Sequence, residues 1–291
     1  MKKMNQSINF TACIVLALVL NACSANMGDD EYFGYVFDEL LEKWGFTYQN
    51  VCPSVTDAVE YPEPWDADAK KTFVIPDETI CSMSTCGLLV SCLKDPVYIG
   101  NWTMNNLYAP GVSLFNNELR ENIMALEFFN RSDFYPVLIS KYLSVIKVTE
   151  LEGSAVVGSA VNGPGYLEWI LASDMCLSAM SQNAKVQLMV IALERTKYAV
   201  DFEKNQACMI MISIMKSCKY TPFMEDIEPR LIETSSGYAM LEPGVQPRFI
   251  VYMGYTMYDH ISCGAISNAL SIHDRDIIME FAKQFINKQE L

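Results

Sequence analysis

A joint between helices that occurs twice is the sequence feature that most constrains the fold of this chain. The segments Asn-Arg-Ser-Asp-Phe-Tyr-Pro136 and Ser-Cys-Lys-Tyr-Thr-Pro222 each separate two stretches whose apolar residues recur at helical spacing. Each proline falls in the first turn of the second stretch, where its missing amide donor costs a helix little. The repeated joint therefore predicts helical hairpins from Asn116 onward.

Three hairpins follow from the apolar spacing. The first starts at Asn116 and has Asp133 as the cap of its second helix. The next starts at Gly163, with Asn183 as a cap, and the third starts at Asn205. Successive second helices are roughly 48 and then roughly 38 residues apart, close to the repeat of HEAT and armadillo units. The prediction is an all-α fold, an irregular α-solenoid of HEAT-like hairpins. An irregular helical bundle is the alternative, since such hairpins build one equally well.

Other segments depart from the hairpin pattern. A short helix is expected over about Ser84 to Lys94, after a polar, proline-rich excursion. Pro229 should end the last helix of the third hairpin. The stretch from Arg248 to Tyr258 is rich in strand formers and predicts a short strand or hairpin. A helix over about Asp274 to Lys288 closes the chain.

The N-terminus carries an export signal. Lys2 and Lys3 precede an apolar run without charge over residues 10–20. This run is too short to cross the ~30 Å hydrocarbon core of a bilayer, which takes roughly 20 apolar residues. The sequence therefore predicts that the segment is removed after export.

The run ends in Leu20-Asn-Ala-Cys23. This pattern resembles the lipobox of bacterial lipoproteins, and the resemblance implies that residues 1–22 are a signal peptide and that Cys23 carries acyl chains such as palmitate. Two or three such chains hold a protein on a membrane almost permanently. An ordinary signal peptide followed by an incidental cysteine is the alternative.

Residues 23–31 form a tether of small residues that ends in an acidic cluster. The tether resembles the export tags on surface lipoproteins of Bacteroidetes. The predicted location is therefore the cell envelope, on the outer membrane, with the surface and the periplasmic face both open. Beyond the tether we divide the chain into a helical and irregular N-terminal region, 32–115, which begins with an amphipathic helix, and a hairpin region, 116–291.

Two further motifs contribute to a resemblance that covers more of the chain. They are Ser-Thr-Cys-Gly-Leu-Leu, which starts at Ser84, and Pro-Gly-Val-Ser-Leu-Phe-Asn-Asn117. Together with the lipobox and the hairpins they resemble a group of helical, HEAT-like lipoproteins of Bacteroidetes. The resemblance covers most of the chain after Cys81. It implies a fold and a location, and it brings no activity to carry over.

The charged residues and the cysteines indicate which partners and which disulfides to expect. The chain has 21 basic and 35 acidic residues, and no basic run, which argues against nucleic acid as a partner. Cysteines near loops are the disulfide candidates, with their pairing left open: Cys52, Cys81, Cys86 and Cys92. Cysteines among Met, Ile and Leu on helical stretches are expected to be buried thiols: Cys176, Cys208 and Cys218.

Catalytic and metal-binding patterns are weak. Asp259, His260 and Cys263 contain an acid, a base and a thiol, but no oxyanion-hole glycine turn accompanies them, and such residues commonly end a strand or cap a helix. The spacing of Cys81, Cys86 and Cys92 is not that of a zinc knuckle. We therefore predict no catalytic residue, metal site or cofactor.

The better functional candidate is a loop in which aromatic residues alternate with amides. It contains Trp102, Asn105, Asn106 and Tyr108. Flat rings and amides can stack on and hydrogen-bond to sugars or peptides. In the alternative, the two rings fold under and cover helix ends.

The sequence as a whole predicts a membrane-tethered, non-enzymatic helical lipoprotein that binds a protein, peptide or glycan, or acts as a scaffold. A cell-envelope hydrolase that uses carboxylates, or Cys263 with His260, is one alternative. A purely structural envelope protein is the other.

Overall fold

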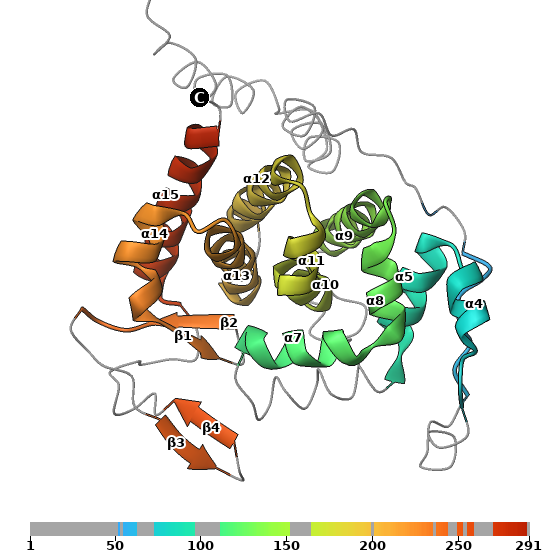
Figure 1. Ribbon diagram of the computed structural model, residues 1–291. Coiled ribbons are helices and arrows are strands. Elements are labelled where there is room, and N and C mark those ends of the chain that lie inside the picture. Colours follow the sequence, from blue (N-terminus) through green and yellow to red (C-terminus); the bar gives the residue numbers. More distant parts are fainter. Residues whose placement is uncertain are drawn as a thin grey trace, which may run out of the picture.

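The computed structural model describes the chain in ten stretches: 52, 55–62, 73–96, 111–151, 164–198, 201–234, 237–243, 249–252, 255–258 and 270–289. Within these stretches the chain is mostly helical, as the sequence predicts (Figure 1). No helix in them is long and apolar enough to cross a membrane. The signal peptide, Cys23, the tether and the amphipathic helix expected after it lie outside the described residues.

The helices come first along the chain and the strands lie near its end. The first helices are α4 (Asp77–Ser82), α5 (Thr85–Lys94), α7 (Gly111–Glu121), α8 (Ile123–Asn130) and α9 (Phe134–Leu151). The middle ones are α10 (Pro164–Ala172), α11 (Asp174–Ala179), α12 (Gln182–Tyr198), α13 (Asp201–Ser217) and α14 (Thr221–Asp226). The last elements are η1 (Glu228–Arg230), β1 (Leu231–Thr234), β2 (Gly237–Met240), β3 (Phe249–Tyr252), β4 (Tyr255–Tyr258) and α15 (Ile272–Gln289).

Helix α13 lies among many of the other elements. It packs against α10, α11, α12, α14, α15 and strand β2 (Figure 1). Every residue from Asn205 to Met215 is buried, so that no side of the helix faces solvent over this stretch. A helix that is apolar nearly all round is stable only inside a body of other elements. The methionine- and isoleucine-rich sequence of α13 explains this position.

The core continues to the other side of the molecule, where α5 packs against α8 and α9. Buried apolar residues form one connected cluster from Ile80 in α4 to Phe285 in α15. Figure 1 shows α4 and α15 at opposite sides of this body. The division of the chain into an N-terminal region, 32–115, and a hairpin region, 116–291, stays a prediction.

The first predicted helix of two hairpins is in fact two shorter helices. Asn122 separates α7 from α8, and its Oδ1 accepts hydrogen bonds from the amides of Met124 and Ala125 at 2.8 and 3.0 Å. Ser173 separates α10 from α11, and its Oγ accepts from the amide of Cys176 at 3.2 Å. A short polar side chain can replace the helical acceptor of these amides, so it starts a new helix with little loss.

One predicted cap is also wrong. Asn183 lies inside α12, and the hydroxyl of Ser181 accepts the hydrogen bond from the Ala184 amide. Both residue types favour caps, so composition alone did not decide between them. Asp133 precedes α9 as predicted, and its carboxylate accepts a hydrogen bond from Thr85 Oγ1 at 2.6 Å.

Two hairpins of strands lie near the end of the chain. Strands β3 and β4 form an antiparallel pair with Phe249 opposite Tyr258, which confirms the strand prediction there. The pair β1 and β2, with Leu231 opposite Met240, was not predicted. Helix α14 ends at Asp226, as Pro229 predicts, and a 3-10 turn then leads into β1.

Candidate functional site

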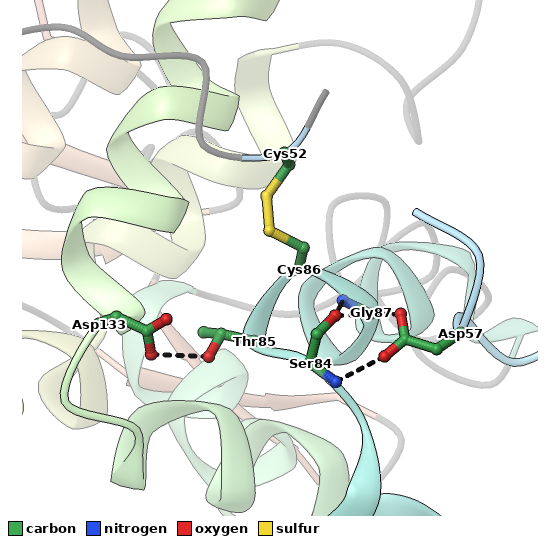
Figure 2. Close-up of a disulfide and its surroundings, with 7 residues drawn as sticks. All are labelled: Cys52, Asp57, Ser84, Thr85, Cys86, Gly87 and Asp133. Carbon is green, nitrogen blue, oxygen red and sulfur yellow. Dashed lines mark hydrogen bonds between the residues drawn. A yellow bond between two sulfur atoms is a disulfide. The ribbon is translucent and has the colours of Figure 1, made fainter. Parts of the chain in front are cut away.

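A segment of extended chain lies along α5 and is joined to it by a disulfide. We call residues 55–62 the strap. Cys52, just before the strap, is bonded to Cys86 in the first turn of α5, with 5.9 Å between the two Cα atoms (Figure 2). The bond closes a loop with a sequence separation of 34 residues. The strap is therefore held covalently at its start.

Asp57 of the strap holds the N-terminus of α5. Its carboxylate accepts hydrogen bonds from the Ser84 amide at 2.6 Å and from Ser84 Oγ at 3.0 Å, as Figure 2 shows. Ser84 Oγ in turn accepts from the Gly87 amide at 2.9 Å, as an N-cap. The Ser84 amide, more than any other group, lowers the pKa of Asp57 below its usual value. A Cβ on Gly87 would collide with the Asp57 carboxylate, which would have to move away.

Farther along, the strap binds the middle of α5. The amide of Val59 donates to Ser91 Oγ at 2.8 Å, and Tyr61 Oη donates to the Ser91 carbonyl at 3.2 Å. Val59 and Tyr61 also pack against the edge of the core. Burial raises the pKa of Tyr61, and the charge of Asp95 raises it further. Tyr61 Oη also lies 3.8 Å from Met124 Sδ, so the side chain reaches α8 as well.

The space behind this side of α5 is small. A cavity of about 10 Å³ lies among α5, α7, α8 and α10, which is at the lower limit for a single water molecule. Its lining is almost entirely apolar: Leu89, Cys92, Leu119, Asn122, Ala125, Phe128, Phe129, Tyr166 and Ile170. Apolar side chains therefore nearly fill the core behind α5.

The cysteine predictions are partly confirmed. Cys52 and Cys86 form the disulfide, while Cys81 and Cys92 are free thiols, contrary to expectation. Cys81 is exposed at the end of α4, and Cys92 is buried on the inner side of α5, where burial raises the pKa of its thiol. The position of a cysteine near a loop in the sequence does not predict whether its side chain faces the strap, as Cys86 does, or the core, as Cys92 does.

Cys176 and Cys208 are buried thiols on helices, as predicted, whereas Cys218 is a thiol just past α13 that is only half-buried, contrary to the prediction. Cys176 and Cys208 are fully buried, and burial raises the pKa of both. Cys218 is half-buried, and its Sγ lies 3.5 Å from Gln182 Oε1. These thiols belong to the core and its edge.

A buried ion pair, which sequence reasoning missed, joins three helices. Glu168 of α10 accepts a hydrogen bond from Tyr142 Oη of α9 at 2.7 Å, and Arg195 Nε of α12 lies 3.7 Å from the same carboxylate oxygen. The side chains of Glu168 and Arg195 are 0% and 1% exposed. Groups so fully enclosed are kept from solvent, and their charges are compensated by one another. The available signal was Glu168 itself, which stands in the apolar run Tyr-Leu-Glu-Trp-Ile-Leu.

The sequence-predicted site residues lie outside the described residues. This holds for Trp102, Asn105, Asn106 and Tyr108, and for Asp259, His260 and Cys263. The candidate loop is nevertheless bounded by two described helices, α5 and α7. Within the described stretches, no group of three or more His, Cys, Asp or Glu residues could hold a metal ion.

We compared the chain with known protein families, curated proteins and solved structures. No protein-family model, no curated protein and no solved structure matches the chain.

Proposed function

We propose that this chain is an exported lipoprotein, held on the outer membrane by acyl chains on Cys23, whose helical body binds a partner or acts as a scaffold without catalysis. The observation that carries the proposal is the N-terminal pattern of two lysines, an apolar run and Leu20-Asn-Ala-Cys23. The resemblance of residues 23–31 to an export tag favours the outer membrane.

The disulfide supports an exported location. Disulfides persist in oxidising compartments and are rare where thiols are kept reduced. The Cys52–Cys86 bond also sets where the body is attached to its anchor, because Cys52 precedes the other described residues. The chain from Cys23 to Cys52 can span at most about 100 Å, at roughly 3.5 Å per residue. The body would therefore act within this distance of the membrane.

Partner binding is assigned to the loop with Trp102, Asn105, Asn106 and Tyr108. Its support is chemical, since rings and amides suit sugars and peptides. The described helices before and after this segment in the sequence, α5 and α7, both contribute to the core. Loops on a rigid scaffold commonly carry binding residues.

The arrangement of the helices, as a HEAT-like stack or as a helical bundle, is also part of the proposal. Consecutive helices that pack together within one predicted hairpin, such as α8 with α9 and α13 with α14, support hairpin units. The burial of α13 on all sides instead favours the helical bundle, because repeats in a solenoid contact only their neighbours.

The anchor is tested by metabolic labelling with a palmitate analogue. The wild-type protein should be labelled and should sediment with outer membranes, and Cys23→Ala should lose both properties. Cys13→Ala is the matched control, because Cys13 lies in the removed segment and its loss should change neither result. Labelling of Cys23→Ala, or membrane release of the wild type by salt, would overturn the proposal.

The binding loop is tested by co-sedimentation with purified peptidoglycan and by peptide arrays. Asn105→Ala/Asn106→Ala should weaken capture about tenfold or more if both amides bind, since each hydrogen bond lost is worth about 1 kcal/mol. Asn117→Ala, an exposed amide on α7, is the matched control. The structural envelope role predicts no capture of either probe. The hydrolase predicts turnover that is lost in Cys263→Ser or His260→Gln.

A further inference from the structure

The strap is held on α5 by one covalent bond and by weaker contacts at Ser84 and Ser91. Its hydrogen bonds to Ser84 involve two exposed residues, Asp57 and Ser84. Water competes for such exposed groups, so their net contribution is small. The disulfide acts differently, because it keeps the start of the strap next to α5. A strap that has come off α5 therefore binds again at a high effective concentration.

The strap covers apolar surface. Val59 and Tyr61 pack against the core, and both bind Ser91, the residue before Cys92. Cys92 is only 7% exposed. If the strap leaves, α5 at Ser91, next to Cys92, and the neighbouring side of α8, which Tyr61 touches at Met124, lose their cover.

The bond itself is within reach of a reductant. Cys52 and Cys86 are both half-buried rather than enclosed, unlike Cys176 and Cys208. Figure 2 shows the disulfide to one side of the Asp57–Ser84 contacts.

We propose that the Cys52–Cys86 disulfide is a redox-sensitive latch that holds the strap over the α5–α8 edge of the core. A dithiol reductant of the thioredoxin class opens it: one reductant thiolate attacks a disulfide sulfur, and its second thiol resolves the mixed disulfide. Two protons and two electrons pass to Cys52 and Cys86, and the reductant leaves as its own disulfide. The open form exposes the α5–α8 edge while the rest of the core stays folded. This inference does not depend on the lipid anchor.

The test reads the thiols that the protein already has. The full mature chain is incubated with N-ethylmaleimide, and mass spectrometry of peptides follows the alkylation of each cysteine. Three samples are compared: the oxidised wild type, the wild type reduced with dithiothreitol and then freed of it, and the Cys52→Ser/Cys86→Ser variant. In the last two samples Cys92 should be alkylated at least about tenfold faster than in the first. Without the disulfide the strap opens more often, and each opening exposes Cys92 to the reagent.

Cys176 and Cys208 are internal controls for global unfolding. They are fully buried on α11 and α13 and should stay unreacted in all three samples. No acceleration at Cys92 after reduction would overturn the latch, since the strap would then stay in place without its bond. Equal acceleration at Cys92, Cys176 and Cys208 would also overturn it, because the disulfide would then stabilise the whole molecule.

A second variant separates the latch from the weaker contacts. Asp57→Asn removes the carboxylate that binds Ser84 and leaves the disulfide intact. The oxidised variant should alkylate Cys92 at nearly the wild-type rate. Acceleration by Asp57→Asn as large as that caused by reduction would show that hydrogen bonds, and not the disulfide, hold the strap.

Discussion

Gly237 starts strand β2 with a backbone that other residues rarely adopt. Its φ is +107°, and a Cβ there would lie 3.1 Å from the side chain of Met209 on α13. Gly237→Ala should therefore lower the free energy of unfolding by about 1–3 kcal/mol, from backbone strain and from displaced packing. Urea denaturation measures the loss. A change within error would mean that the hairpin can turn without this conformation.

Lys219 shows the opposite case, a positive φ without glycine. It follows α13 at φ +48°, and its neighbour Tyr220 donates its amide to the Met215 carbonyl at 3.0 Å, as in a Schellman motif. Lys219→Gly should raise the free energy of unfolding by about 0.5–1 kcal/mol, because glycine adopts this conformation without a steric cost. Lys219→Ala is the control, since it removes the same charge and keeps the Cβ. A gain of equal size in both variants would assign the effect to charge.

The buried ion pair predicts two unequal losses. Tyr142→Phe removes one hydrogen bond to Glu168 and should cost about 1–3 kcal/mol. Glu168→Gln removes the negative charge facing the Arg195 guanidinium and should cost more, about 3–5 kcal/mol, because the positive charge stays buried. Both are read from urea denaturation curves. The reverse order would show that solvent or another group compensates Arg195.

At the scale of elements, sequence reasoning succeeded where the signal is local. The helix from Ser84 to Lys94, the end of α14 before Pro229 and the strands within 248–258 all follow from caps, proline and strand formers. It failed where long helices split, at Asn122 and Ser173. There the apolar spacing continues across the break, and only the cap hydrogen bond interrupts it.

The candidate site was less predictable than the helices. The cysteine candidates included Cys52 and Cys86, but their pairing depends on how the strap lies on α5. Asp57 gave no signal at all, since its partner Ser84 is far away in sequence. Contacts of this kind are set by packing of the whole body, which local propensities do not contain.

The strap predicts a pH dependence of stability. The folded-state pKa of Asp57 is depressed, chiefly by the Ser84 amide. The carboxylate therefore stabilises the folded state at pH values above its ordinary pKa of 3.8, and the contribution disappears as the pH falls through the lower folded-state pKa. Asp57→Asn should lower the midpoint of thermal unfolding at pH 6, and the difference from wild type should shrink towards pH 3. A difference that stays constant with pH would contradict a role for the charge.

At the scale of the whole molecule, cooperativity distinguishes the two architectures that the sequence leaves open. In a solenoid each unit contacts its neighbours only, so a local defect spreads a short way along the chain. Here one apolar cluster connects Ile80 of α4 with Phe285 of α15, and α13 contacts helices from several parts of the sequence. The described body should therefore unfold as one unit.

Ile80→Val tests this with a small change at one side of the body. Ile80 is 2% exposed on α4, and α15 lies at the opposite side (Figure 1). Loss of one buried methylene costs about 0.5–1.5 kcal/mol, or roughly a 2- to 12-fold change in the unfolding equilibrium. In a cooperative bundle, hydrogen exchange of the best-protected amides of α15 should accelerate by this factor, equal to that in α5. In a HEAT-like stack, the acceleration would be confined to α4, α5 and α8, and α15 would exchange at the wild-type rate.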